Sequence, residues 1–250
     1  MDETLQLLVK AAEEAELSTG VGIGYVLSVE RQLSVEAAEQ LAKVAIRGAE
    51  EFTIRGRPAV VGFGLHGPEE GNPPTKFAKV FDILGRRRDR MNGNGSGLAS
   101  LPHAGEIAPF PGKGAQSVVD AITILKAKRI GHGVLAADDD HAIEVIRDSN
   151  VCLDVCVSSN YWLNVAETRE SHPIKRLLLK GVPCTINSDD PLLFGCSLLS
   201  EYEVCRNDLK MDDDMLASCA KHSFDYSCAP EEMKTKQCNA IDSWLSSEPM

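Results

Sequence analysis

The sequence lacks the features that mark exported and membrane proteins. None of its apolar runs approaches the roughly 18 residues that a membrane-spanning helix needs. Its first five residues carry two acidic side chains, whereas a signal or transit peptide begins with basic ones. Cysteine is absent from the first 151 residues, and the eight cysteines that follow include no Cys-x-x-Cys pair. We therefore expect a cytoplasmic protein with free thiols and no membrane partner.

Basic side chains are also in short supply. The chain has 26 lysines and arginines against 37 aspartates and glutamates, which gives a formal net charge of −11. Such a surface repels phosphate backbones and anionic lipids, so nucleic acid is excluded as a first choice of partner. A small neutral or cationic ligand fits this charge better. The sequence gives no indication of a protein partner.

Two cysteines, Cys152 and Cys156, fall on one face of a strand-like run. Thiolates at such positions are possible metal ligands. Free cysteine is, however, among the most frequently buried residue types. We therefore interpret both as apolar core thiols.

Short apolar runs rich in β-branched residues recur along the chain, and a stretch with helical spacing follows each of them. The runs span residues 21–27, 58–63, 98–101, 129–132, 151–155 and 182–186. The helical stretches show apolar residues three or four positions apart, for example Leu41, Val44 and Ala45 after Ser34. This alternation predicts an α/β fold with a parallel sheet, because parallel neighbours need a crossover and a helix supplies it.

The predicted strands begin about 20 to 40 residues apart, a spacing that suits a TIM-type barrel of β/α units. We find no internal repeat and no linker, so we expect a single domain over residues 1–250, with a C-terminal helix and tail at 230–250. The glycine- and asparagine-rich segment 85–97 joins a helix to a strand and is interpreted as a solvated loop.

Polar residues follow three of the predicted strands, at the barrel end where catalytic side chains gather. His103 and Glu106 follow the third strand; this pair can place an imidazole on a metal and a carboxylate over a substrate, or can be a helix start with an incidental histidine. His132 ends the fourth strand between two glycines, which also suit a simple tight turn. Asp189 and Asp190 follow the sixth strand, as a cation-binding pair or as a cap before Pro191. Together the five residues favour a functional site.

These motifs resemble the adenosine deaminase family, the purine deaminases of the metal-dependent amidohydrolase superfamily. The likeness extends over residues 21–226. Its motifs are His103-Ala104-Gly105-Glu106, Arg129-Ile130-Gly131-His132-Gly133 and Ser188-Asp189-Asp190-Pro191, with Gly181-Val182-Pro183 before the last and Leu192-Leu193-Phe194-Gly195 after it. Membership implies a TIM-type (β/α)8 barrel and one Zn²⁺ ion.

The resemblance also implies a role for each residue. His103 and Asp189 would be zinc ligands. Glu106 would protonate the purine ring nitrogen, and His132 would orient and deprotonate the attacking water. Asp190 and the backbone of Gly67 would bind the purine. The activity implied is hydrolytic deamination of a 6-aminopurine nucleoside, with adenosine as the expected substrate and inosine and ammonia as products.

The sequence departs from the family pattern in two places. Relatives carry a His-x-His pair of zinc ligands at the end of their first strand, and no such pair precedes residue 21 here. Because six strands are visible where a closed barrel has eight, we expect a barrel that is incomplete at its N-terminus, from either a fragment or a decayed relative, and prefer the fragment. The second departure is His66, beside Gly67, where relatives usually carry acidic residues.

Several alternative functions stay open. Adenine and aminodeoxyfutalosine deaminases share the same chemistry, whereas an AMP deaminase would need a basic cluster at the barrel mouth that this sequence lacks. A catalytically silent barrel remnant that acts as a binding protein is an alternative from another class. A deaminase of a pyrimidine ring is the third.

Overall fold

The computed structural model describes residues 2–90, 97–107 and 113–247. Contacts within the chain group it into two compact units, one made of residues 1–102 and 123–127 and the other of residues 103–122 and 128–250. Residues 85–90 of the segment expected to form a solvated loop belong instead to the helix Ala78–Arg90, and residues 91–96 lie outside the described residues. Within the described ranges, no helix combines the length and the apolar character needed to cross a membrane.

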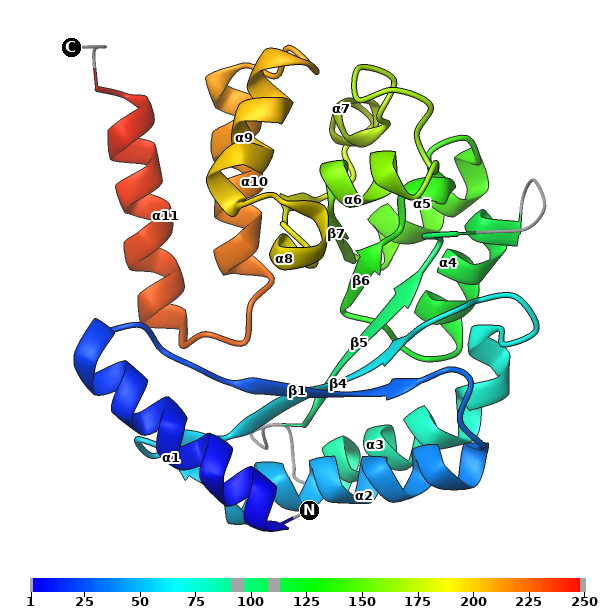
Figure 1. Ribbon diagram of the computed structural model, residues 1–250, viewed down its shortest axis with the longest axis vertical. Coiled ribbons are helices and arrows are strands. Elements are labelled where there is room, and N and C mark those ends of the chain that lie inside the picture. Colours follow the sequence, from blue (N-terminus) through cyan, green and yellow to red (C-terminus); the bar gives the residue numbers. More distant parts are fainter. Residues whose placement is uncertain (1, 91–96, 108–112, 248–250) are drawn as a thin grey trace. The chain divides into compact units, whose positions relative to one another are not determined.

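Among the described residues, the first unit contains three α-helices and a parallel sheet (Figure 1). Strand β1 pairs with β4, and β4 pairs with residues 99–102 of β5. Its elements in chain order are α1 (Asp2–Thr19), β1 (Tyr25–Glu30), α2 (Val35–Glu51), the short hairpin strands β2 (Thr53–Ile54) and β3 (Arg57–Pro58), β4 (Val60–His66), the 3₁₀ turn η1 (Pro74–Phe77), α3 (Ala78–Arg90) and β5 (Ala99–Ala104).

Helix α2 shows how the sequence specifies this unit. Ser34 is its N-cap, and its hydroxyl accepts a hydrogen bond from the backbone N–H of Ala37 at 3.2 Å. Ala38, Ala42 and Ala45 then recur at helical spacing and are completely buried. The helix therefore lies with one apolar face on the sheet.

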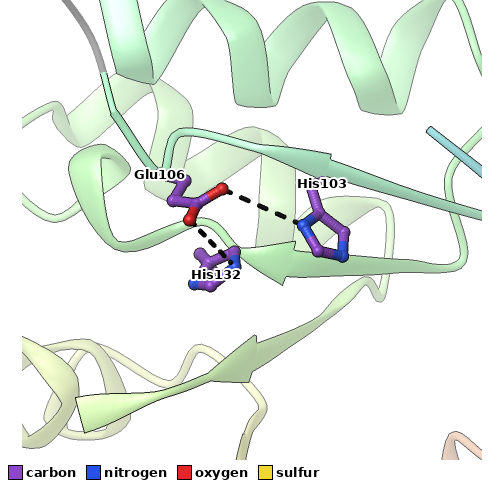
Figure 2. A group of neighbouring side chains, drawn as sticks. All are labelled: His103, Glu106 and His132. Atoms are coloured by element: carbon purple, nitrogen blue, oxygen red, sulfur yellow. Dashed lines mark ion pairs between the residues drawn. The ribbon is translucent and has the colours of Figure 1, made fainter. Parts of the chain in front are cut away.

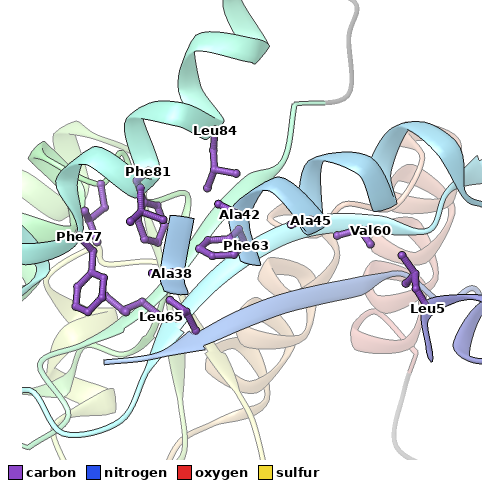
Figure 3. Packing of buried hydrophobic residues seen from close by; sticks show 13 residues of the cluster. Leu5, Ala38, Ala42, Ala45, Val60, Phe63, Leu65, Phe77, Phe81 and Leu84 are labelled. Carbon is purple, nitrogen blue, oxygen red and sulfur yellow. The ribbon is translucent and has the colours of Figure 1, made fainter. Parts of the chain in front are cut away.

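The core of the first unit lies between the sheet and helices α2 and α3 (Figure 3). Phe63 of β4 packs edge-on against Phe81 of α3, with ring centroids 5.5 Å apart. Val60 and Leu65 of the same strand are also fully buried. Full burial of each such side chain contributes about 1.5 to 3 kcal/mol.

The second unit continues the parallel pairing from the end of β5. His103 and Ala104 pair with Gly131 and His132 of β6, β6 pairs with β7, and β7 pairs with β8. Its elements are α4 (Lys113–Thr123), β6 (Arg129–His132), η2 (Val134–Ala136), α5 (Asp140–Asp148), β7 (Cys152–Val155), α6 (Val157–Trp162), α7 (Ile174–Leu179), β8 (Cys184–Ile186), α8 (Pro191–Phe194), α9 (Leu198–Asn207), α10 (Asp213–Asp225) and α11 (Glu231–Leu245).

The structure confirms the predicted α/β fold and all six predicted strands, which are hydrogen-bonded in the order β1-β4-β5-β6-β7-β8. The first strand begins at Tyr25 rather than at residue 21, because glycines at positions 20, 22 and 24 weaken the extended segment before it. Helix α1 and the β2–β3 hairpin were not predicted. The predicted C-terminal segment contains α11, and the single-domain organisation stays a prediction.

Candidate metal and catalytic site

Three side chains that the sequence singles out lie together in the second unit (Figure 2). Both imidazoles face the Glu106 carboxylate. Glu106 Oε2 lies 3.9 Å from His103 Nδ1, and Oε1 lies 3.5 Å from His132 Nε2. The two imidazole rings meet edge-on with centroids 5.0 Å apart. His132 is buried at 1% exposure of its side chain, whereas 37% of His103 is exposed, so the cluster reaches from the interior to the surface.

Asp189 approaches the same histidine from the loop after β8. Its Oδ2 lies 3.9 Å from His132 Nε2 and accepts a hydrogen bond from the Ser159 hydroxyl at 2.7 Å. Asp189, His132 and Cys156 form a second group, whose possible ligand atoms all lie within 4.8 Å of one another. His132 belongs to both groups and thus links the predicted ligands His103 and Asp189.

The backbone at the end of β6 is shaped around these side chains. A Cβ atom at Gly131 would overlap the His103 ring, so glycine is needed there for the ring to lie against the strand. His132 and Asp189 have φ angles of +66° and +52°, in the left-handed region that side-chain-bearing residues seldom adopt. Such backbone strain is common at functional sites, where it sets the direction of a side chain.

The donor atoms suit a zinc ion. Imidazole nitrogen and carboxylate oxygen are both established zinc ligands, and the two groups supply them at mutual distances that one ion can bridge. The Cys156 thiol is a weaker candidate. Burial, with Asp189 nearby, raises its pKa well above the usual range and keeps it protonated. Joint binding of one ion by His103 and Asp189 stays a prediction.

The two predicted purine-binding residues occupy turns. Asp190 is the N-cap of α8 with Pro191 at the first helical position, yet its side chain accepts no capping hydrogen bond among the described residues. Its exposed carboxylate is therefore not committed to the helix. Gly67 follows β4 in the first unit with φ +93°. Both purine-binding roles stay predictions.

Three buried polar residues around the site were missed from the sequence. Ser159 binds Asp189, and Asn160 and His172 form a hydrogen-bonded row behind His132. Ser159 and Asn160 lie in α6, a few residues after the predicted fifth strand, so the rule that selected the other strand ends could have found them. On the same helix, Trp162 is 58% exposed, and Tyr161 lies beneath the Arg169 guanidinium.

Histidine, glutamate and aspartate side chains gather where β5, β6 and β8 end, and such a donor set is typical of metal-dependent hydrolases. Residues 1–244 match the family model described as adenosine deaminase. The chain therefore belongs to the adenosine deaminase family, as its motifs indicated.

Two curated relatives illustrate the range of substrates in this family. The chain is 38% identical over 241 residues to a putative adenosine/adenine deaminase of Streptomyces coelicolor, covering 96% of this chain and 64% of the relative. It is 34% identical over 236 residues to an aminodeoxyfutalosine deaminase of Streptomyces avermitilis, with 94% and 62% covered. The chain thus spans somewhat less than two thirds of the length of these relatives.

Solved structures show the same fold. An adenine deaminase from Arthrobacter aurescens superposes with a TM-score of 0.81 at 25% identity, covering 95% of this chain and 66% of the other. An amidohydrolase from Burkholderia ambifaria, solved with bound Zn, gives a TM-score of 0.76 at 18% identity, with 96% and 63% covered. This likeness supports the TIM-type barrel, of which six strands lie in the described residues.

Proposed function

We propose that this chain forms the zinc-dependent site of a purine deaminase that converts a 6-aminopurine nucleoside hydrolytically to the 6-oxo product and ammonia. Adenosine is the first candidate substrate, and adenine and aminodeoxyfutalosine, named for its relatives, are the alternatives. The observation that supports the proposal best is the position of His132 Nε2, within 3.5 Å of Glu106 and 3.9 Å of Asp189.

His103 and Asp189 would hold the zinc ion. A bound zinc ion supplies a Lewis acid that lowers the pKa of water from 15.7 to roughly 7, which provides a nucleophile at neutral pH. Ser159 donates to Asp189 Oδ2 and so orients that carboxylate. A cytoplasmic location and a purine nucleoside as the small-molecule partner stay predictions.

Glu106 would act on the ring nitrogen next to the reacting carbon. Only 18% of its side chain is exposed, and its two oxygens face two different imidazoles, so the carboxyl group is held in a fixed orientation. Donation of a proton as charge develops on the ring is a general-acid step typically worth about 10² to 10⁴ in rate. His132 would orient the attacking water, and Asp190 would bind the imidazole side of the purine.

The test is turnover by the purified, zinc-supplemented chain. We expect adenosine, adenine or aminodeoxyfutalosine to be deaminated and cytosine not. Glu106→Gln should lower kcat about 10²- to 10⁴-fold. The matched control is Glu144→Gln on the exposed face of α5, which removes the same charge and should leave kcat unchanged.

Undiminished turnover in Glu106→Gln would refute the role assigned to that residue. Protein that binds purines but neither retains zinc nor turns any of them over would favour the alternative of a silent binding protein.

A further inference from the structure

Three buried polar side chains, those of His132, Asn160 and His172, form a row that extends away from the site. Asn160 is completely buried, and 4% of His172 and 1% of His132 is exposed. Asn160 Nδ2 lies 3.4 Å from His132 Nδ1, and Asn160 Oδ1 lies 3.1 Å from His172 Nε2. The backbone N–H of Ile174 donates to His172 Nδ1 at 3.2 Å. The chemistry described above uses neither Asn160 nor His172.

The contact of His172 with the backbone of Ile174 determines which atoms donate and which accept along this row. A backbone N–H can only donate, so His172 Nδ1 must be an acceptor and carry no hydrogen. Burial lowers the pKa of His172 to about 3, which keeps the ring neutral at ordinary pH. A neutral imidazole has its hydrogen on one nitrogen, which in His172 is therefore Nε2.

The Asn160 amide relates the hydrogen position in His172 to that in His132. Because His172 Nε2 donates, the Asn160 atom that faces it must be the carbonyl oxygen, and the amide nitrogen must face His132. That nitrogen only donates, so His132 Nδ1 accepts. An imidazole carries hydrogen on at least one ring nitrogen, so a ring whose Nδ1 accepts is neutral and has its hydrogen on Nε2, the atom for which contacts of 3.5 and 3.9 Å with Glu106 and Asp189 are given.

We propose that Asn160 and His172 are positioning residues that hold neutral His132 in the form with its hydrogen on Nε2. The use made of that hydrogen rests on the proposed function. In this form Nε2 has no lone pair to take a proton from water. His132 then orients the attacking water as a hydrogen-bond donor, and the deprotonating half of the role implied by the family resemblance does not fall to it.

Nuclear magnetic resonance of protein labelled with ¹⁵N in its histidines tests the proposal directly. A ring nitrogen that carries hydrogen and one that does not resonate far apart, so a long-range ¹H–¹⁵N spectrum gives the tautomer of each of the six histidines. His132 and His172 are assigned from the signals missing in His132→Gln and His172→Gln. We expect both rings to carry hydrogen on Nε2, with and without added zinc.

Asn160→Asp should reverse the direction of the hydrogen bond between residue 160 and His132 Nδ1. An ionised carboxylate only accepts hydrogen bonds, so His132 should move its hydrogen to Nδ1 while His172 is unchanged. The matched control is Asn164→Asp, an exposed position four residues along the chain, which adds the same charge and should leave both tautomers as they are. We expect kcat/KM to fall about 10- to 100-fold in Asn160→Asp and not in the control.

Hydrogen on Nδ1 of His132 in the wild-type spectrum would overturn the proposal, as would an unchanged His132 tautomer in folded Asn160→Asp. The wild-type spectrum decides the matter even where Asn160→Asp does not fold. A wild-type chain that deaminates no purine would refute the proposed function alone, because the tautomers are measured without substrate.

Discussion

Strand β6 carries two polar clusters at its opposite ends, and they differ in the distances between their polar atoms. At its start, Arg129 makes three hydrogen bonds of 2.5 to 3.1 Å to the Asp154 carboxylate, which also accepts from Thr185 at 2.9 Å. At its end, the contacts of His132 with Glu106 and Asp189 measure 3.5 and 3.9 Å. The first cluster has hydrogen-bonding distances, whereas the contacts in the second are at or beyond the limit of a hydrogen bond.

This contrast follows the rule for TIM-type barrels, in which one end of the strands stabilises the fold and the other carries the chemistry. The Arg129–Asp154 pair satisfies its charges within the protein and should matter for stability. The cluster at the end of β6 brings two carboxylates, those of Glu106 and Asp189, close to one nitrogen of His132. It also holds His132 and Asp189 in left-handed backbone conformations, which costs stability. The variants below are designed to separate these two effects.

Substitution of a predicted zinc ligand should have the largest effect. Asp189→Asn keeps the size of the side chain but removes its charge, so zinc affinity should fall by more than the roughly 10- to 100-fold typical of supporting residues. Metal content after dialysis measures this. Urea unfolding of the metal-free protein should change little, and an Asp189→Asn protein that retains zinc like wild type would contradict the assignment of this ligand.

Removal of the ion pair between Arg129 and Asp154 should reduce the stability of the protein instead. Arg129→Met leaves the partly buried Asp154 carboxylate without its cation, and we expect a loss of about 1 to 3 kcal/mol in the free energy of unfolding. The double variant Arg129→Met/Asp154→Leu removes both charges and should recover part of that loss. Losses in the single variants Arg129→Met and Asp154→Leu that add up to the loss in the double variant would show that the pair is not coupled.

Ser159→Ala should have a smaller, local effect. It removes the 2.7 Å hydrogen bond that orients Asp189, and zinc affinity should fall by about 10-fold, at the lower end for supporting residues. Isothermal titration with zinc measures the change. Ser158→Ala, next to it on α6 and also buried, is the control, because the recorded hydrogen bond of Ser158 is made by its backbone N–H.

The smallest effect concerns pH. Because the folded-state pKa of His172 is about 3 and the ordinary value is 6.5, only the unfolded chain binds a proton there as the pH falls through this range. The contribution of His172 to stability is complete above pH 6.5 and declines towards pH 3, by about 1 kcal/mol between pH 6 and pH 5.

Urea midpoints measured at these two pH values test this linkage. They should converge in His172→Gln relative to wild type, and they should not converge in His141→Gln, which changes an exposed histidine on α5. A wild-type pH dependence retained in His172→Gln would contradict the prediction.

The sequence predicted the elements that depend on local pattern and missed those that depend on tertiary packing. The six strands were predictable because β-branched apolar runs stand out between helical stretches, and His103, Glu106, His132 and Asp189 because they follow such runs. The row from His132 to His172 was not, since a hydrogen bond across 28 residues to Asn160 leaves no periodic signal. The short β2–β3 hairpin was missed because each of its strands has only two residues.

The most direct test of the account is an X-ray absorption or anomalous diffraction measurement on the zinc-loaded chain. We predict one zinc ion with an imidazole nitrogen of His103 and a carboxylate oxygen of Asp189 both at about 2.0 to 2.2 Å. A zinc ion that has only one of these residues among its ligands, or a chain that holds no zinc after supplementation, would contradict it.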